Sequence, residues 1–126
     1  MNVVDSSGGL EYFPAGVNAA FFIPPIQATD QLLVPTICLY EVFKRLLAGL
    51  GEDVALQAIG LMARAQEVNL TRQVALEAAR ISLERKLAMA DSIILATAYT
   101  HNATLWTQDE HFKGLPGVKY IAKQEP

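Results

Sequence analysis

Four acidic residues of this 126-residue chain lie within or directly after apolar segments, where a solvated charge is not expected. They are Asp5, Glu41, Asp91 and Asp109. A carboxylate in apolar surroundings is costly to ionise unless it is paired or bound to a cation. Because the four acids are spread along the whole chain, they suggest a site that the fold assembles to hold a hard metal ion.

The elements that must position these acids follow an alternating pattern. Short apolar runs alternate with longer helical patterns, which is typical of βαβ units and a parallel sheet. The strands are expected at Asn2–Val4, Leu32–Val34, Glu67–Leu70, Thr104–Thr107 and Val118–Ile121. Asp5 and Asp109 then follow the carboxyl ends of two strands, the edge where open parallel sheets place ligand sites.

The helices between these strands show the 3.6-residue period. Three apolar stripes are expected to face the core: Leu39, Phe43, Leu46 and Leu50; Val54, Ala58, Leu61 and Ala65; and Leu76, Ala79, Leu83 and Leu87. The segment Asp91–Tyr99 is apolar nearly all round, so it predicts a central, buried helix with Asp91 in its first turn. Glu41 falls in the first turns of the helix after the second strand.

Each acid also has a structural interpretation. Asp91 could cap a helix N-terminus, and the two strand-end acids could be turn residues. Glu41 lies opposite the expected leucine stripe with Lys44 and Arg45 at i+3 and i+4. That spacing is typical of a solvated ion-paired face worth only ~0.2–0.5 kcal/mol per pair, and periodicity alone favours it. Six other acids are expected to be surface charges: Glu11, Asp30, Glu52, Asp53, Glu77 and Glu84.

Composition limits the classes of function. The length predicts one domain, residues 1–126, and 52% hydrophobic content fits a compact α/β domain or a buried subunit interface. A net charge of −3 and a pI near 5.3 argue against nucleic-acid binding by bulk electrostatics, but not against a metal-dependent nuclease. One cysteine and no membrane-spanning apolar run predict a cytoplasmic chain. His101 and His111 form no zinc motif.

At the four acids the chain resembles the PIN domain, and closely the VapC-type toxins of type II toxin–antitoxin systems. The matching segments, in the family's order and spread over the whole chain, are Val3–Ser7 with Leu10–Phe13, Pro35–Arg45, Ala90–Ala98 and Thr107–Phe112. The resemblance implies a three-layer α/β/α fold with a small central parallel sheet. It also implies an Mg²⁺- or Mn²⁺-dependent ribonuclease.

By this resemblance Asp5, Glu41, Asp91 and Asp109 correspond to the family's metal-binding acids, so Glu41 is expected to face a catalytic groove. Ser7 and Thr107 resemble the hydroxyl residues that support them. Five cationic residues flank the matching segments and are candidates for contact with RNA phosphates: Lys44, Arg45, Arg85, Lys86 and Lys113. The chain departs from the family at Gly9, where a larger residue is frequent, and at His111, where another acid is common.

The resemblance further implies an RNA substrate, a cognate antitoxin protein that blocks the acidic groove, and a homodimer. One alternative keeps the fold but makes the chain an RNA-processing nuclease without toxicity. Another is a non-enzymatic acidic metal-binding α/β module such as a receiver domain. A receiver domain needs a second acid beside the first strand's Asp and a Lys after a late strand, but here Asp5 precedes Ser6 and Thr107 precedes Gln108.

Overall fold

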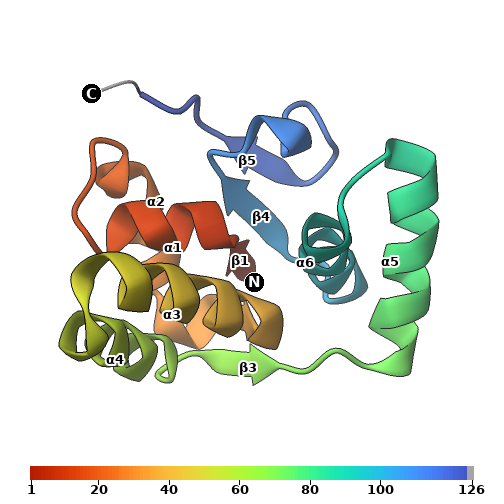
Figure 1. Ribbon diagram of the computed structural model, residues 1–126. Coiled ribbons are helices and arrows are strands. Elements are labelled where there is room, and N and C mark those ends of the chain that lie inside the picture. Colours follow the sequence, from red (N-terminus) through yellow and green to blue (C-terminus); the bar gives the residue numbers. More distant parts are fainter. Residues whose placement is uncertain (125–126) are drawn as a thin grey trace.

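The computed structural model describes residues 1–124 and contains a five-stranded parallel sheet with the order β3-β2-β1-β4-β5 (Figure 1). The strands are β1 (Asn2–Val4), β2 (Leu32–Pro35), β3 (Gln66–Val68), β4 (Thr104–Thr107) and β5 (Val118–Tyr120). All five predicted strands are therefore present. The third strand ends at Val68 rather than Leu70, whose side chain is exposed.

Six α-helices cover the sheet in the described residues: α1 (Ser6–Tyr12), α2 (Ala19–Gln27), α3 (Thr36–Leu50), α4 (Glu52–Met62), α5 (Arg72–Arg85) and α6 (Met89–Thr100). Short 3₁₀ turns, η1 (Thr29–Gln31) and η2 (Glu110–Phe112), precede β2 and follow β4. The first four helices lie on one side of the sheet and α5 and α6 on the other (Figure 1). Right-handed crossovers in this strand order require that division. The three-layer α/β/α fold is confirmed.

Helix α6 is the central helix, as predicted. Every residue from Ser92 to Ala98 is buried. Its two buried hydroxyls bond within the helix: Ser92 Oγ donates to Ala88 O at 2.7 Å and Thr97 Oγ1 to Ile93 O at 2.8 Å. These bonds satisfy polar groups that would otherwise be costly in the core. The first turn of α6, including Asp91, emerges from this core at the end of the sheet.

The expected core faces of the other helices are wrong in detail. In α3 the predicted Leu46 is buried, but the other buried residues are Cys38 and Val42, and the predicted Leu50 is 52% exposed. Leucines three and four residues apart fit more than one helix face. The buried face is rotated toward smaller residues: Cys38 packs in the core cluster that contains the sheet, and Val42 packs with Leu46 and the alanines of α4. This rotation places Glu41 at the edge of the buried face instead of opposite it.

The same error affects α4 and α5. In α4 the predicted Ala58 is buried together with Ala55, and in α5 the buried residues are Val74, Ala78 and Ile81. The predicted Leu87, just after α5, is buried as well. The predicted stripe residues Leu61, Leu76 and Leu83 are exposed, the last two by 62% and 84%. Small and β-branched residues let these helices approach their neighbours closely, and several leucines remain outside.

The sequence did not predict the two helices between β1 and β2. Pro24 and Pro25 lie inside α2, where they supply no backbone N–H, so the pattern reads as a break. In α1, Gly8 and Gly9 allow close packing. A Cβ on Gly8 would lie 2.5 Å from Val4 Cγ1, and one on Gly9 would lie 3.1 Å from Val42 Cγ2. A larger residue at position 9 would therefore need Val42 to move.

No helix within residues 1–124 combines the length and the apolar character that a bilayer crossing requires.

Candidate active site

The acids converge where the strand order of the sheet reverses. The chain leaves β1 toward β2 on one side and later adds β4 on the other, so the carboxyl ends of β1 and β4 flank a crevice. Asp5 follows β1 directly and Asp109 lies just beyond β4. Glu41 from α3 and Asp91 from α6 reach the crevice from opposite layers. All four acids line one groove of about 950 Å³, which is large enough for nucleotide units.

Asp5 is the most buried acid of the groove, with 3% of its side chain exposed. Its Oδ1 accepts hydrogen bonds from Ser7 Oγ at 2.7 Å and from Gly8 N at 3.0 Å, so it also caps α1. Its Oδ2 accepts from Thr107 Oγ1 at 2.7 Å. Burial raises the pKa of Asp5 to about 6, although these hydrogen bonds favour the charged form.

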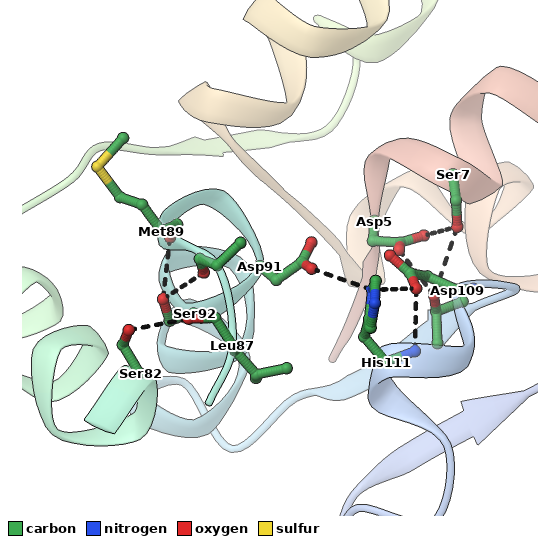
Figure 2. Close-up of polar contacts among 11 residues, drawn as sticks. Asp5, Ser7, Ser82, Leu87, Met89, Asp91, Ser92, Asp109 and His111 are labelled. Atoms are coloured by element: carbon green, nitrogen blue, oxygen red, sulfur yellow. Dashed lines mark hydrogen bonds and ion pairs between the residues drawn. The ribbon is translucent and has the colours of Figure 1, made fainter. Parts of the chain in front are cut away.

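The two hydroxyl residues predicted to support the acids, Ser7 and Thr107, both donate to Asp5; the contact of Ser7 is seen in Figure 2. Thr107 Oγ1 also accepts the backbone N–H of Asp109 at 2.9 Å, which links the two strand-end acids through one side chain. Ser7 Oγ accepts the backbone N–H of Gln108 at 3.3 Å. Both hydroxyls therefore hold the end of β4 against the start of α1.

Asp109 and Asp91 meet at His111 (Figure 2). His111 Nδ1 lies 2.9 Å from Asp109 Oδ1 and 3.8 Å from Asp91 Oδ2. Asp109 also caps η2, because its Oδ1 accepts the backbone N–H of His111 at 3.0 Å. Burial raises the pKa of Asp91, and the charges of Asp109 and Glu41 raise it further while His111 lowers it. The acids are thus close enough to repel one another.

Glu41 is held by a residue that the sequence did not single out. Ser6 Oγ donates to Glu41 Oε1 at 2.6 Å. This bond fixes one carboxylate oxygen and leaves the other for the groove. Ser6 directly follows Asp5, so α1 positions both acids at once.

The donor atoms of the groove suit a divalent cation of the Mg²⁺ or Mn²⁺ type, which prefers carboxylate oxygen and water. The set whose possible ligand atoms all lie within 4.8 Å of one another consists of Asp91, Asp109 and His111. Asp5 and Glu41 line the same groove outside this set.

The predicted RNA-binding residues are not all in the groove. Arg45 lines it, whereas Lys44, Arg85, Lys86 and Lys113 do not. Lys44 Nζ lies over the Tyr40 ring at 5.5 Å, and Lys113 Nζ over the Tyr120 ring at 5.9 Å. The groove instead includes Lys123 and Tyr120, which lie outside the matching segments and carried no signal in the sequence.

A buried polar network, also missed from the sequence, supports the groove wall. Gln108 Nε2 donates to Ser7 O and to Glu11 Oε1, both at 3.2 Å, and its Oε1 accepts from Asn18 Nδ2 at 3.0 Å. Asn18 N donates to Glu11 Oε2 at 2.7 Å. Glu11 is therefore a structural partner and not the surface charge that was expected. Its position in the sequence, on an unpredicted helix, hid this role.

Solved structures share this fold over almost their whole length. A toxin–antitoxin complex from Klebsiella pneumoniae matches with a TM-score of 0.81 and 22% identity over 94% of this chain and 96% of that chain. VapC20 of Mycobacterium tuberculosis, described as a sarcin–ricin loop cleaving toxin, matches with a TM-score of 0.77 and 15% identity over 92% of this chain and 95% of that chain. DNA-bound VapBC from Salmonella typhimurium matches with a TM-score of 0.75 and 17% identity over 97% of this chain and 98% of that chain. At these identities the likeness concerns the fold.

Two comparisons of sequence were made with known proteins and families. Among curated proteins, none matches the chain significantly. The family model of the PIN domain matches residues 3–118, which contain most of β1, all of β2, β3 and β4, and all four groove acids. The chain belongs to the PIN domain family.

Proposed function

We propose that this chain is a metal-dependent ribonuclease that hydrolyses RNA phosphodiester bonds. The observation that carries the proposal is the convergence of Asp5, Glu41, Asp91 and Asp109 on one groove at the carboxyl edge of the sheet. Burial raises the pKa values of Asp5 and Asp91, and the charge of Asp109 beside them raises both further. Such a group of acids is stabilised by a bound cation.

The proposed cofactor is Mg²⁺ or Mn²⁺. When bound, such an ion activates water and stabilises the negative charge that develops on the phosphoryl group. Asp5, Asp91 and Asp109 are assigned to hold the main ion, and Asp109 is also the carboxylate that would orient water or reach a second ion. Glu41 is assigned to bind through water or to accept the proton of the attacking water, with Ser6 holding its other oxygen in place.

The proposed substrate is RNA that lies along the groove. Arg45 and Lys123 line the groove and can contact phosphates, while the acids between them would repel RNA without a cation. The departing fragments are expected to carry a 3′-hydroxyl and a 5′-phosphate. Because the overall charge is −3, binding depends on these local groups and not on a basic surface.

We further propose that the chain is a toxin with a cognate antitoxin. The supporting observation is that similarly folded chains include a sarcin–ricin loop cleaving toxin and toxins in complexes with antitoxins. A homodimer is also proposed. Its support is the exposed apolar surface, including Leu76 and Leu83 seven residues apart on one face of α5. An RNA-processing nuclease of the same fold is the alternative.

Cleavage of total RNA by the purified protein tests the activity. Wild type is compared with Asp5→Asn and with Asp30→Asn, which removes an exposed carboxylate outside the groove. Each is assayed with Mg²⁺, Mn²⁺ or EDTA, and the product ends are mapped. We expect wild type and Asp30→Asn to cut with metal, and Asp5→Asn to be inactive. Cutting in EDTA, or full activity of Asp5→Asn, would refute the metal assignment.

Expression in a bacterial host tests the biological role. A toxin without its antitoxin should arrest growth and degrade RNA when wild type is induced, and Asp109→Asn should be tolerated. Unimpaired growth with active, cleaving enzyme in the cells would favour the processing role. Light scattering of the purified protein tests the dimer, and a monomer at micromolar concentration would exclude a stable one.

A further inference from the structure

We infer that His111 binds the metal ion directly through Nδ1, and that this nitrogen ligand shifts the preference of the site from Mg²⁺ to Mn²⁺. The inference rests on the proposed function, since it concerns the ion of the same groove. It goes further because it adds a ligand outside the four acids and decides between the two candidate ions.

The imidazole is aimed at the carboxylates and not away from them (Figure 2). The same ring nitrogen, Nδ1, faces both Asp109 Oδ1 at 2.9 Å and Asp91 Oδ2 at 3.8 Å. These three residues form the set whose ligand atoms lie within 4.8 Å of one another. His111 therefore occupies the position that a third ligand would take.

The separations suit one octahedral ion. With ligands at about 2.1 Å, adjacent ligand atoms lie about 3.0 Å apart and opposite ones about 4.2 Å apart. The pair formed by His111 and Asp109 has the adjacent spacing. The pair formed by His111 and Asp91 lies between the two values, so a small rotation of either side chain completes the geometry.

The turn that carries His111 is fixed although its side chain is 67% exposed. Its backbone N–H donates to Asp109 Oδ1 at 3.0 Å, and the next residue, Phe112, is fully buried in the core. The ring is thus held at the mouth of the groove beside two acids. A ligand on a preorganised element loses less entropy when it binds the ion.

The chemistry of the nitrogen sets the preference. Mg²⁺ is a hard ion that favours oxygen ligands, whereas imidazole suits first-row transition ions. Replacing one oxygen ligand by imidazole favours Mn²⁺ relative to Mg²⁺. Without metal, the same contact is a hydrogen bond or ion pair with Asp109. The competing interpretation is that this contact persists and His111 never reaches the ion.

Spectroscopy of bound Mn²⁺ separates these cases, because electron spin echo modulation detects a directly bound ¹⁴N. Wild type, His111→Asn and His111→Asp are compared, and the matched control is His101→Asn. His101 is the only other histidine, and it lies at the end of α6, where its Nδ1 contacts Thr97 O at 2.9 Å. Mg²⁺ and Mn²⁺ dissociation constants are measured by titration calorimetry of the same four proteins.

We expect ¹⁴N coupling in wild type and His101→Asn, and its loss in both His111 variants. Mn²⁺ affinity should fall about 10-fold or more in His111→Asn, in the range for disturbed metal ligation. His111→Asp should bind Mg²⁺ more tightly than wild type does. Tight Mn²⁺ binding by wild type without ¹⁴N coupling would overturn this inference and leave the proposed function intact. Absence of Mn²⁺ and Mg²⁺ binding by wild type would overturn both.

Discussion

Replacing Asp5 by Asn should stabilise the metal-free protein, although Asp5 caps a helix and accepts three hydrogen bonds. With 3% of its side chain exposed, Asp5 is the acid least able to be solvated. An Asn keeps one oxygen for Ser7 Oγ and Gly8 N. Its amide nitrogen faces Thr107 Oγ1, which can accept in place of donating. The shape and most of the bonds are therefore conserved while the charge is removed.

The size of the effect follows from the pKa of Asp5. Raising it from 3.8 to about 6 makes the ionised form less favourable in the folded state by roughly 3 kcal/mol. Rearranging the Thr107 hydroxyl costs about 1 kcal/mol. Asp5→Asn should therefore increase the free energy of unfolding by roughly 2 kcal/mol at pH 7.5 without metal.

The pH dependence of this stability difference tests its direction separately. A raised pKa in the folded state means that the neutral form stabilises the fold below about pH 4, and that this stability is lost as the pH rises through 6. After the cost of the Thr107 rearrangement is subtracted, Asp5→Asn should have no advantage at pH 4, about a third of its full advantage at pH 5 and the full advantage above pH 7.

Urea unfolding in EDTA, followed by the fluorescence of the single tryptophan Trp106, measures these differences. Asp30→Asn serves as the control, because it removes an equal charge from an exposed position. A variant that is less stable than wild type at pH 7.5, or a difference that does not change with pH, would refute the reasoning. Adding Mn²⁺ should stabilise wild type and have little effect on Asp5→Asn.

Three further predictions concern packing, metal support and RNA contact. Gly8→Ala should destabilise the fold by about 1–3 kcal/mol because its methyl group has no room. Gly49→Ala, in open space on α3, should stabilise it by up to about 1 kcal/mol; urea unfolding compares the two. Thr107→Val should weaken Mn²⁺ binding by about 10–100-fold in calorimetry, and Thr107→Ser should restore it. Arg45→Ala should reduce the slope of log affinity against log salt for single-stranded RNA by about 0.7, whereas Lys44→Ala should leave it unchanged. Fluorescence anisotropy with Ca²⁺ in place of the catalytic ion measures the slope, and equal changes in both variants would contradict the placement of Arg45.

The strands could be predicted because their signal is local. A short apolar run between polar segments fixes a buried parallel strand such as β4 almost to the residue. The helix faces could not be predicted as well, because leucines at 3- and 4-residue spacing also cover exposed surface. Leu83, 84% exposed, belonged to the expected stripe, and Val74 in the true core did not. Which side faces the sheet is decided by packing between distant elements.

The acids of the site could be predicted from their surroundings, but their partners could not. Asp5, Asp91 and Asp109 are anomalous as charges in apolar segments, and the structure places all three in the groove. Periodicity alone made Glu41 a surface charge, and only the family resemblance placed it at the groove; the structure explains the difference, because the buried residues of α3 are Cys38, Val42 and Leu46. Ser6 and Gln108 gave no signal, because short polar residues beside a strand end are ordinary in turns.

The way in which the groove holds its acids favours cation binding. Within residues 1–124, the only ion-pair partner of these carboxylates is His111, and no lysine or arginine pairs with them. Neutral donors hold two of the acids instead. Asp5 accepts from Ser7 Oγ, Gly8 N and Thr107 Oγ1, and Glu41 accepts from Ser6 Oγ. A lysine would neutralise the groove and compete with a divalent ion for the same oxygens. Hydroxyl and amide donors orient the carboxylates but leave their charge for the ion. The cost of keeping that charge is the lower stability of the metal-free protein, which Asp5→Asn should recover.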